Sequence, residues 1–109
     1  MRFLRTTLLL LAVAAVFYTL RAASAAPEVN AGDIFKQKCA MCHGPDGKGI
    51  KMINTPDFTS AKWQASVTDS TIVDTIKNGK KGTAMPPWGD KLKPEEVTAL
   101  LHYIRSLKK

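Results

Sequence analysis

Residues 39–43 read CAMCH, and this motif contains the only two cysteines of the 109-residue chain. Cys39 and Cys42 are three positions apart, and His43 follows the second cysteine directly. Two cysteines at this spacing can bind a zinc ion, exchange disulfides or attach a haem group. The choice among these three chemistries decides what can fill the core of the fold.

The N-terminal residues have the three-part layout of a secretory signal peptide. Arg2 and Arg5 are followed by an apolar run over residues 8–20 and then by the small-residue stretch AASAAP at residues 22–27. The sequence therefore predicts export from the cytoplasm, to the periplasm.

We expect residues 1–25 to be the signal peptide, cut after Ala25, and residues 26–109 to form one domain. The alternative is an uncleaved membrane anchor, which Arg21 favours because it lies between the apolar run and the cleavage region. The apolar run is shorter than the roughly 20 residues that a spanning helix needs. Cleavage is therefore the favoured prediction.

Without the predicted signal peptide, thirteen basic residues remain against nine acidic ones, so the formal net charge falls from +7 to +4. The lysines are scattered and lack the interleaved aromatic residues of single-strand binders, which argues against a nucleic-acid partner. A domain of roughly 80 residues buries little surface, and such domains commonly need a disulfide, a metal or another group for stability. We therefore expect a cofactor in the core.

Apolar periodicity predicts three helices, over residues 31–42, 69–77 and 94–107, separated by loops rich in glycine and proline. Thr68 is a suitable N-cap for the second helix, and Pro94 suits the first position of the third. Strand patterns are nearly absent. The predicted fold class is all-α with irregular loops.

The context of the motif favours haem over the other two chemistries. A thioredoxin-type site needs strands alternating with helices, and structural zinc needs four ligands, whereas His102 is the only further Cys or His in the chain. Haem attachment uses the whole motif, since Cys39 and Cys42 can form thioethers with the two vinyl groups and His43 can bind the iron. The motif is short, so this interpretation needs a second axial ligand.

Met85 is the best candidate for that ligand, because it lies in a glycine- and proline-rich loop 42 residues after His43. Met41 lies inside the motif and cannot reach the opposite haem face. We expect Met52 to pack against the haem ring and His102 to be a surface residue on the polar face of the third helix. A thioether opposite an imidazole raises the haem potential, which suits an electron carrier.

The stretches CAMCHG, DGKG, GTAMPPWGDKL and PEEVTALLHYIRSL together resemble the small bacterial class I cytochromes c along nearly the whole predicted mature chain. The resemblance implies the class I cytochrome c fold, with three main helices and long loops wrapped around one covalently bound haem c. It also implies six cofactor-binding residues: Cys39, Cys42, His43, Met85, Pro56 and Thr83.

In this family pattern the iron lies between His43 and Met85. Pro56 matches the proline whose carbonyl oxygen accepts a hydrogen bond from the axial histidine, and Thr83 matches a hydroxyl near the inner haem propionate. Trp63 either donates to a propionate or only packs, and Trp88 is expected to pack beside the methionine loop. The first and third helices are expected to cross at Gly32, Phe35, Leu100 and Tyr103.

The function that the resemblance implies is single-electron transfer between redox partners in the periplasm. We expect neither enzymatic activity nor a small-molecule substrate at the iron, because both axial positions are filled. Four lysines are expected near the haem edge: Lys38, Lys48, Lys80 and Lys81. They either guide the protein onto acidic docking patches of redox proteins or only keep it soluble.

Two other functions remain open. The first is a membrane-anchored or tightly bound cytochrome c subunit of a larger dehydrogenase or oxidase, in which the N-terminal segment is retained and the membrane becomes a partner. The second is a haem enzyme or ligand sensor with an open distal position.

Overall fold

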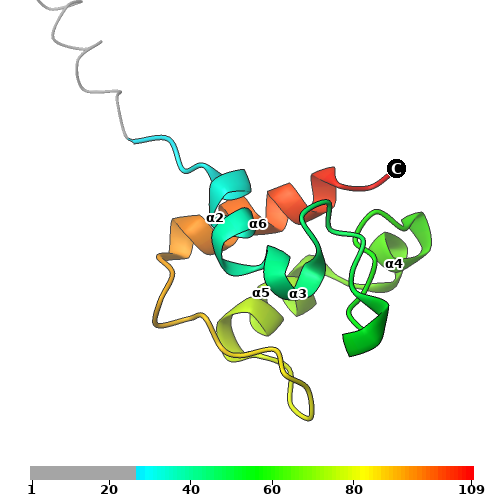
Figure 1. Ribbon diagram of the computed structural model, residues 1–109. Helices are drawn as coiled ribbons and strands as arrows, with labels where there is room; N and C mark the ends of the chain where they lie inside the picture. Colours follow the sequence, from blue (N-terminus) through cyan, green and yellow to red (C-terminus); the bar gives the residue numbers. More distant parts are fainter. Residues whose placement is uncertain (1–26) are drawn as a thin grey trace, which may run out of the picture.

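The computed structural model describes residues 27–109, and Figure 1 traces their path. The elements in this part of the chain are α2 (Ala31–Lys38), α3 (Ala40–His43), the 3-10 turn η1 (Lys51–Ile53), α4 (Ala61–Ser66), α5 (Asp69–Asn78) and α6 (Pro94–Ser106). They include no β-strand, so the fold of residues 27–109 is all-α, as predicted. The predicted signal peptide, residues 1–25, lies outside the described residues.

The predicted helix over residues 31–42 is divided into α2 and α3 at Cys39, where φ is −116° and ψ is −34°. The helical path nearly continues, because Cys39 N donates to Phe35 O at 2.9 Å and His43 N donates to Cys39 O at 3.0 Å. Asn30 caps the start of α2 by accepting from Asp33 N at 3.1 Å. The motif therefore occupies one turn that begins at the division.

The two later helices match their predicted bounds to within one residue. The hydroxyl of Thr68 accepts from Thr71 N at 3.1 Å, which confirms the predicted cap of α5. Lys93 precedes α6 and has no side-chain acceptor, but the Glu96 carboxylate accepts from its backbone N–H at 2.8 Å. A carboxylate in the first turn thus replaces the missing cap of α6.

Two short elements, η1 and α4, lie where the sequence predicts only loop. Ser60 caps α4 by accepting from Trp63 N at 3.3 Å. A serine directly before AKWQAS is the sequence signal for this helix, but six residues are too few to display a period of 3.6. In the described residues, no helix is long and apolar enough to cross a membrane.

The core forms where α2 crosses α6 above α5 (Figure 1). Phe35 and Leu100 are each 1% exposed, and the Phe35 and Tyr103 ring centroids lie 5.1 Å apart. A Cβ on Gly32 would lie 3.5 Å from the Tyr103 ring, so glycine permits the close crossing. The predicted helix crossing is confirmed. The buried apolar residues are Phe35, Phe58, Ile72, Ile76, Leu92, Val97, Leu100, Leu101 and Ile104.

Candidate functional site

The two cysteines of the motif lie at the start of α3 and within it, and both are free thiols. Cys42 is exposed and Cys39 is half-buried. Burial raises the pKa of the Cys39 thiol to about 11, although the nearby Lys38 opposes this rise. Because the thiolate is the nucleophile in disulfide exchange, a protonated Cys39 is poorly suited to that chemistry at neutral pH.

His43 is the last residue of α3, and its ring stacks on the buried Phe58, with centroids 4.8 Å apart and planes at 24°. Burial lowers the pKa of the His43 imidazole, which favours the neutral form that binds metals. Its Nδ1 atom is buried and has no hydrogen-bond partner among the described residues.

No three His, Cys, Asp or Glu side chains of residues 27–109 are grouped so that they could hold a metal ion. A metal bound at His43 would therefore have to bring most of its own ligands. A porphyrin does so, and two free thiols and a neutral imidazole on one short turn are the chemistry that haem c requires. The residues present therefore fit haem c.

The predicted hydrogen bond from His43 to the Pro56 carbonyl is absent from the described part of the chain, where Nδ1 has no partner. The neighbouring Thr55 holds the motif instead: its hydroxyl donates to Cys42 O at 2.7 Å and accepts from Ile50 N at 2.7 Å. Sequence reasoning missed Thr55, because the bond to Cys42 spans thirteen residues and depends on how the loop folds back.

Met85 lies in a loop that leaves and rejoins the C-terminal end of α5. At the loop's end, Trp88 N donates to Ile76 O at 2.9 Å and Gly89 N donates to Lys77 O at 3.0 Å. Inside the loop, Lys80 N donates to Met85 O at 3.2 Å. Met85 itself is half-buried. The loop is therefore closed at its base and braced across its middle.

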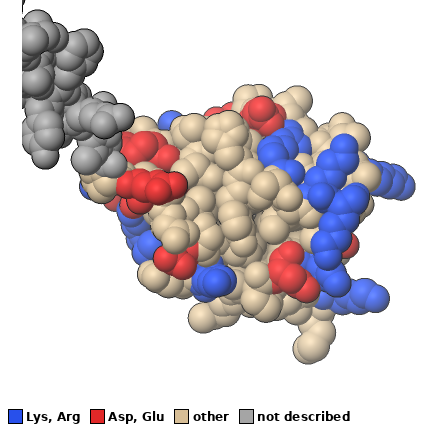
Figure 2. Space-filling view, turned by 90° about the horizontal axis from the view of Figure 1, so that it is seen from above, with Lys and Arg blue, Asp and Glu red and all other residues tan. Residues whose placement is uncertain are grey.

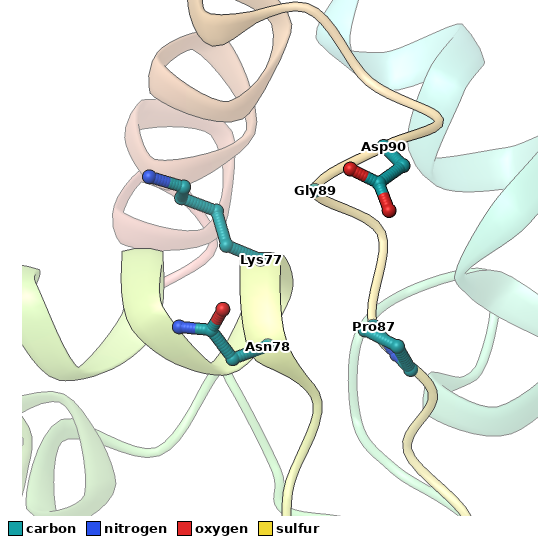
Figure 3. A pocket seen from close by; sticks show the side chains of 5 residues that line it. All are labelled: Lys77, Asn78, Pro87, Gly89 and Asp90. Carbon is teal, nitrogen blue, oxygen red and sulfur yellow. The ribbon is translucent and has the colours of Figure 1, made fainter.

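A pocket lies at this base, between the end of α5 and the returning chain (Figure 3). Its walls are formed by Lys77, Asn78, Pro87, Gly89 and Asp90. None of the six residues predicted to bind haem lines this pocket. The pocket is thus a feature of the loop's attachment and separate from the candidate haem site.

Thr83 holds the backbone of the methionine loop. Its hydroxyl donates to Lys80 O at 2.7 Å and accepts from Met85 N at 3.2 Å. The place of this hydroxyl near a haem propionate stays a prediction, and its contacts among the described residues give it a further role at the backbone of Met85. The Thr83 side chain therefore fixes the backbone from which the Met85 side chain extends.

A contact between Lys38 and Trp88 joins the two halves of the candidate site. The Lys38 Nζ atom lies 5.7 Å from the centroid of the Trp88 ring, and Lys91 Nζ lies 5.2 Å from it. Lys38 directly precedes Cys39, and Trp88 follows Met85 by three residues. In Figure 1, α3 and the methionine loop both lie below the α2–α6 crossing. Trp88 also packs against the hydrophobic core.

The remaining candidates lie apart from this arrangement. Met41 is 88% exposed, and Met52, which was expected to pack, is 96% exposed, so the protein itself does not cover it. His102 is exposed, as predicted. Trp63 packs on Phe58 with centroids 4.7 Å apart, which is one of the two roles expected for it.

The four lysines expected at the haem edge have different surroundings. Lys48 Nζ lies 3.9 Å from an Asp46 carboxylate oxygen, and Lys38 lies over Trp88. Lys80 and Lys81 are exposed on the methionine loop. Figure 2, seen from above, shows that basic side chains also gather along one edge of the molecule, with acidic side chains scattered over the face.

Residues 28–104 match a protein family described as cytochrome c oxidase, cbb3-type, subunit III. The chain is 40% identical over 75 residues to a cbb3-type cytochrome c oxidase subunit FixP from Azorhizobium caulinodans. That match covers 69% of this chain and 25% of the relative. The chain therefore spans about a quarter of the length of such curated relatives.

The fold is also that of solved c-type cytochromes. The structure of the KustC0563 c-type cytochrome superimposes with a TM-score of 0.69 and 34% identity, covering 74% of this chain and 100% of that one. Cytochrome cL from Hyphomicrobium denitrificans superimposes with a TM-score of 0.61 and 27% identity, covering 72% of this chain and 46% of that one. The predicted class I cytochrome c fold is confirmed.

Proposed function

Because this chain belongs to the cytochrome c family described as cbb3-type oxidase subunit III, we propose that residues 26–109 form a haem c domain that passes single electrons within an oxidase complex. The relatives named as oxidase subunits favour the bound-subunit function over a freely diffusing periplasmic carrier. The observation that carries the proposal is the match of residues 28–104 to this family, and the contact of Lys38, which precedes the CAMCH motif, with Trp88 of the methionine loop supports one shared site.

Four residues would hold one haem c. Cys39 and Cys42 would form the two thioether bonds, and His43 and Met85 would occupy the axial positions. Haem c bound in this way supplies an iron that exchanges one electron at a time. If His43 and Met85 both bind the iron, no small-molecule substrate would have access to the metal, and we propose electron transfer without enzymatic activity.

The chain's other residues set how firmly these ligands are presented. Phe58 packs against the neutral His43 imidazole, and the Thr83 hydroxyl holds the backbone of Met85. A firmly held thioether opposite an imidazole raises the reduction potential, which suits electron delivery toward an oxidase.

We propose an acidic patch on a redox protein as the partner of the exposed Lys80 and Lys81, which lie on the loop of Met85. Long-range attraction of this kind speeds association and weakens with salt. Lys80→Gln/Lys81→Gln should slow electron transfer at low ionic strength. The matched control is Lys108→Gln/Lys109→Gln, which removes the same charge at the end of the chain and should have less effect. Equal slowing by both pairs would contradict a docking role for the loop.

The intact mass of the purified protein tests the cofactor. We expect one covalently attached haem, retained after denaturation, and a mass without haem for the Cys39→Ala/Cys42→Ala variant. A protein without covalent haem after expression with a c-type maturation system would overturn the proposal.

Gentle solubilisation of native membranes tests the complex. If the chain is an oxidase subunit, it should co-migrate with an oxygen-consuming complex, and an intact N-terminus would identify residues 1–25 as an anchor. A chain that elutes alone, cut after Ala25, would support the freely diffusing carrier instead.

A further inference from the structure

The contact between His43 and Phe58 is a flat, stacked one. The two ring centroids are 4.8 Å apart and the planes differ by 24°. Phe58 is 6% exposed, so this face of the imidazole is packed against a buried ring. A flat ring restricts rotation of its stacked neighbour more strongly than a branched aliphatic side chain does, because sliding or tilting opens a gap.

Phe58 is itself held by its aromatic neighbours and its backbone. Its ring lies 4.7 Å from Trp63 and 6.4 Å from Phe35, measured between centroids. Its amide N donates to Gly47 O at 2.8 Å. The ring therefore has packed neighbours on more than one side and a fixed attachment to the chain.

A buried amide fixes the carbonyl of the same residue. The Nε2 atom of Gln64 donates to Phe58 O at 2.7 Å and to Ile104 O at 2.8 Å, and Gln64 is 7% exposed. Both N–H bonds of the Gln64 amide thus donate hydrogen bonds, one to the loop that carries Phe58 and one to α6. This amide ties the loop to the longest helix of the described chain.

Arg105 completes this connection from α6. Its Nη1 atom donates to Gln64 Oε1 at 2.9 Å and to Gln64 O at 2.7 Å, and Nη2 donates to Val67 O at 2.7 Å. Its Nε atom donates to Asp69 at 2.8 Å. A buried polar group with every partner in place is rigid, because each displacement would leave a donor or acceptor unpaired.

From this chain of contacts we infer that Phe58 is a positioning residue that sets the plane of the His43 imidazole, and that Gln64 and Arg105 hold Phe58 in place. The inference rests on the proposed function, since the imidazole plane matters only when His43 binds iron. The orientation of an axial imidazole decides how unequally unpaired spin spreads over a ferric haem. Outer contacts of a metal-binding histidine commonly control this orientation.

The test is the ferric holoprotein with Phe58→Leu, which keeps an apolar side chain but removes the flat ring. We expect its haem methyl proton shifts and its electron paramagnetic resonance g values to move from those of the wild type. The methionine-to-iron absorption band should remain. Gln64→Met should move the same signals in the same direction by a smaller amount, because Phe58 is present but less firmly held.

Tyr103→Leu is the matched control, because it removes a ring of the same core that pairs with Phe35 and, among the described residues, with neither Phe58 nor His43. It should lower stability and leave the haem methyl shifts and g values unchanged. Unchanged signals in Phe58→Leu, or equal changes in Phe58→Leu and Tyr103→Leu, would overturn the inference.

If Phe58→Leu gives no holoprotein, Gln64→Met decides alone, and unchanged haem methyl shifts in that variant overturn the inference. The wild-type spectrum separates this result from a failure of the proposed function. A wild type without covalent haem contradicts the proposed function, whereas a normal wild type with an unaffected Phe58→Leu contradicts only the role of Phe58.

Discussion

The carbonyl oxygen of Met85 lies 2.7 Å from the position that a Cβ atom on Gly79 would occupy. Gly79 has a φ of 73°, in the left-handed region, and begins the loop directly after α5. The same Cβ would lie 3.0 Å from the amide nitrogen of Pro87. Glycine is therefore required here for its backbone conformation and for the close return of the methionine loop.

This relationship predicts that Gly79→Ala displaces Met85. The matched control is Gly82→Ala, because Gly82 has a φ of 77° but no atom within 4 Å of its Cβ position. Both variants should lose about 1–2 kcal/mol of stability from the backbone conformation. Only Gly79→Ala should also weaken the methionine-to-iron band and admit carbon monoxide in the ferrous state. Equal behaviour of the two variants in both measurements would contradict the prediction.

Thr83→Val should loosen Met85 because it removes the hydroxyl that donates to Lys80 O and accepts from Met85 N. The loss of a hydrogen bond of this kind costs about 1 kcal/mol. We expect the methionine-to-iron band to disappear at a lower denaturant concentration than global unfolding. Thr83→Ser retains the hydroxyl and should behave like the wild type, and a Thr83→Val band as stable as that of the wild type would contradict this role.

Arg105→Met should destabilise the fold by roughly 3 kcal/mol, because it leaves the Gln64 and Val67 carbonyl oxygens without their donor. Asp69→Asn removes only the charge of an exposed partner and should cost less than about 1 kcal/mol. Denaturant unfolding of the two holoproteins measures the difference. A larger loss in Asp69→Asn than in Arg105→Met would show that the surface ion pair, and not the buried hydrogen bonds, carries the stability.

The hydrogen bonds of Asp57 lead us to expect that the stability of the fold depends on pH in the acidic range. The Asp57 carboxylate accepts a hydrogen bond from the Thr59 hydroxyl at 2.6 Å and one from the Thr59 amide at 2.8 Å. These two bonds, the hydroxyl bond more than the amide bond, hold the pKa of the Asp57 carboxyl below its ordinary value of 3.8. A lowered folded-state pKa stabilises the fold fully above the unfolded-state value, and this contribution is lost as pH falls through the folded-state value. The wild type should therefore exceed Asp57→Asn in stability above pH 3.8.

Unfolding midpoints from neutral pH to below pH 3.8 measure this contribution of Asp57. The gap between the wild type and Asp57→Asn should narrow as pH falls below that value. Thr59→Val removes the hydroxyl donor and should reproduce part of the same trend. A gap that stays constant across the range would contradict the prediction.

The longer helices could be predicted from the sequence because their signals are local, whereas the crossing of α2 and α6 was predicted only from the family resemblance. Periodic apolar residues and the caps at Thr68 and Pro94 all lie within a few positions of the helices that they define. The motif of Cys39 and Cys42 was equally visible. Its chemistry follows from residue types at fixed spacing, which folding does not alter.

The contacts that support the site could not be predicted in the same way. The bond between Arg105 and Gln64 spans 41 residues, and the bond between Thr55 and Cys42 spans 13. Such contacts depend on how loops return to the core, and single residue types do not encode that path. Pro56 and Thr83 illustrate the limit, because their haem-binding roles come from a family pattern, whereas the hydrogen bonds of Thr55 and Thr83 to the backbone appear only in the fold.

The most direct measurement for the central claim is the ferric absorption spectrum of Met85→Ala beside that of Met52→Ala. The claim is that the CAMCH motif and the loop of Met85 are the two faces of one haem site. Met52 is the matched control because it is a methionine that is 96% exposed. The account predicts a methionine-to-iron band in the wild type and Met52→Ala and its loss in Met85→Ala. A band that survives in Met85→Ala, or disappears in Met52→Ala, would contradict it.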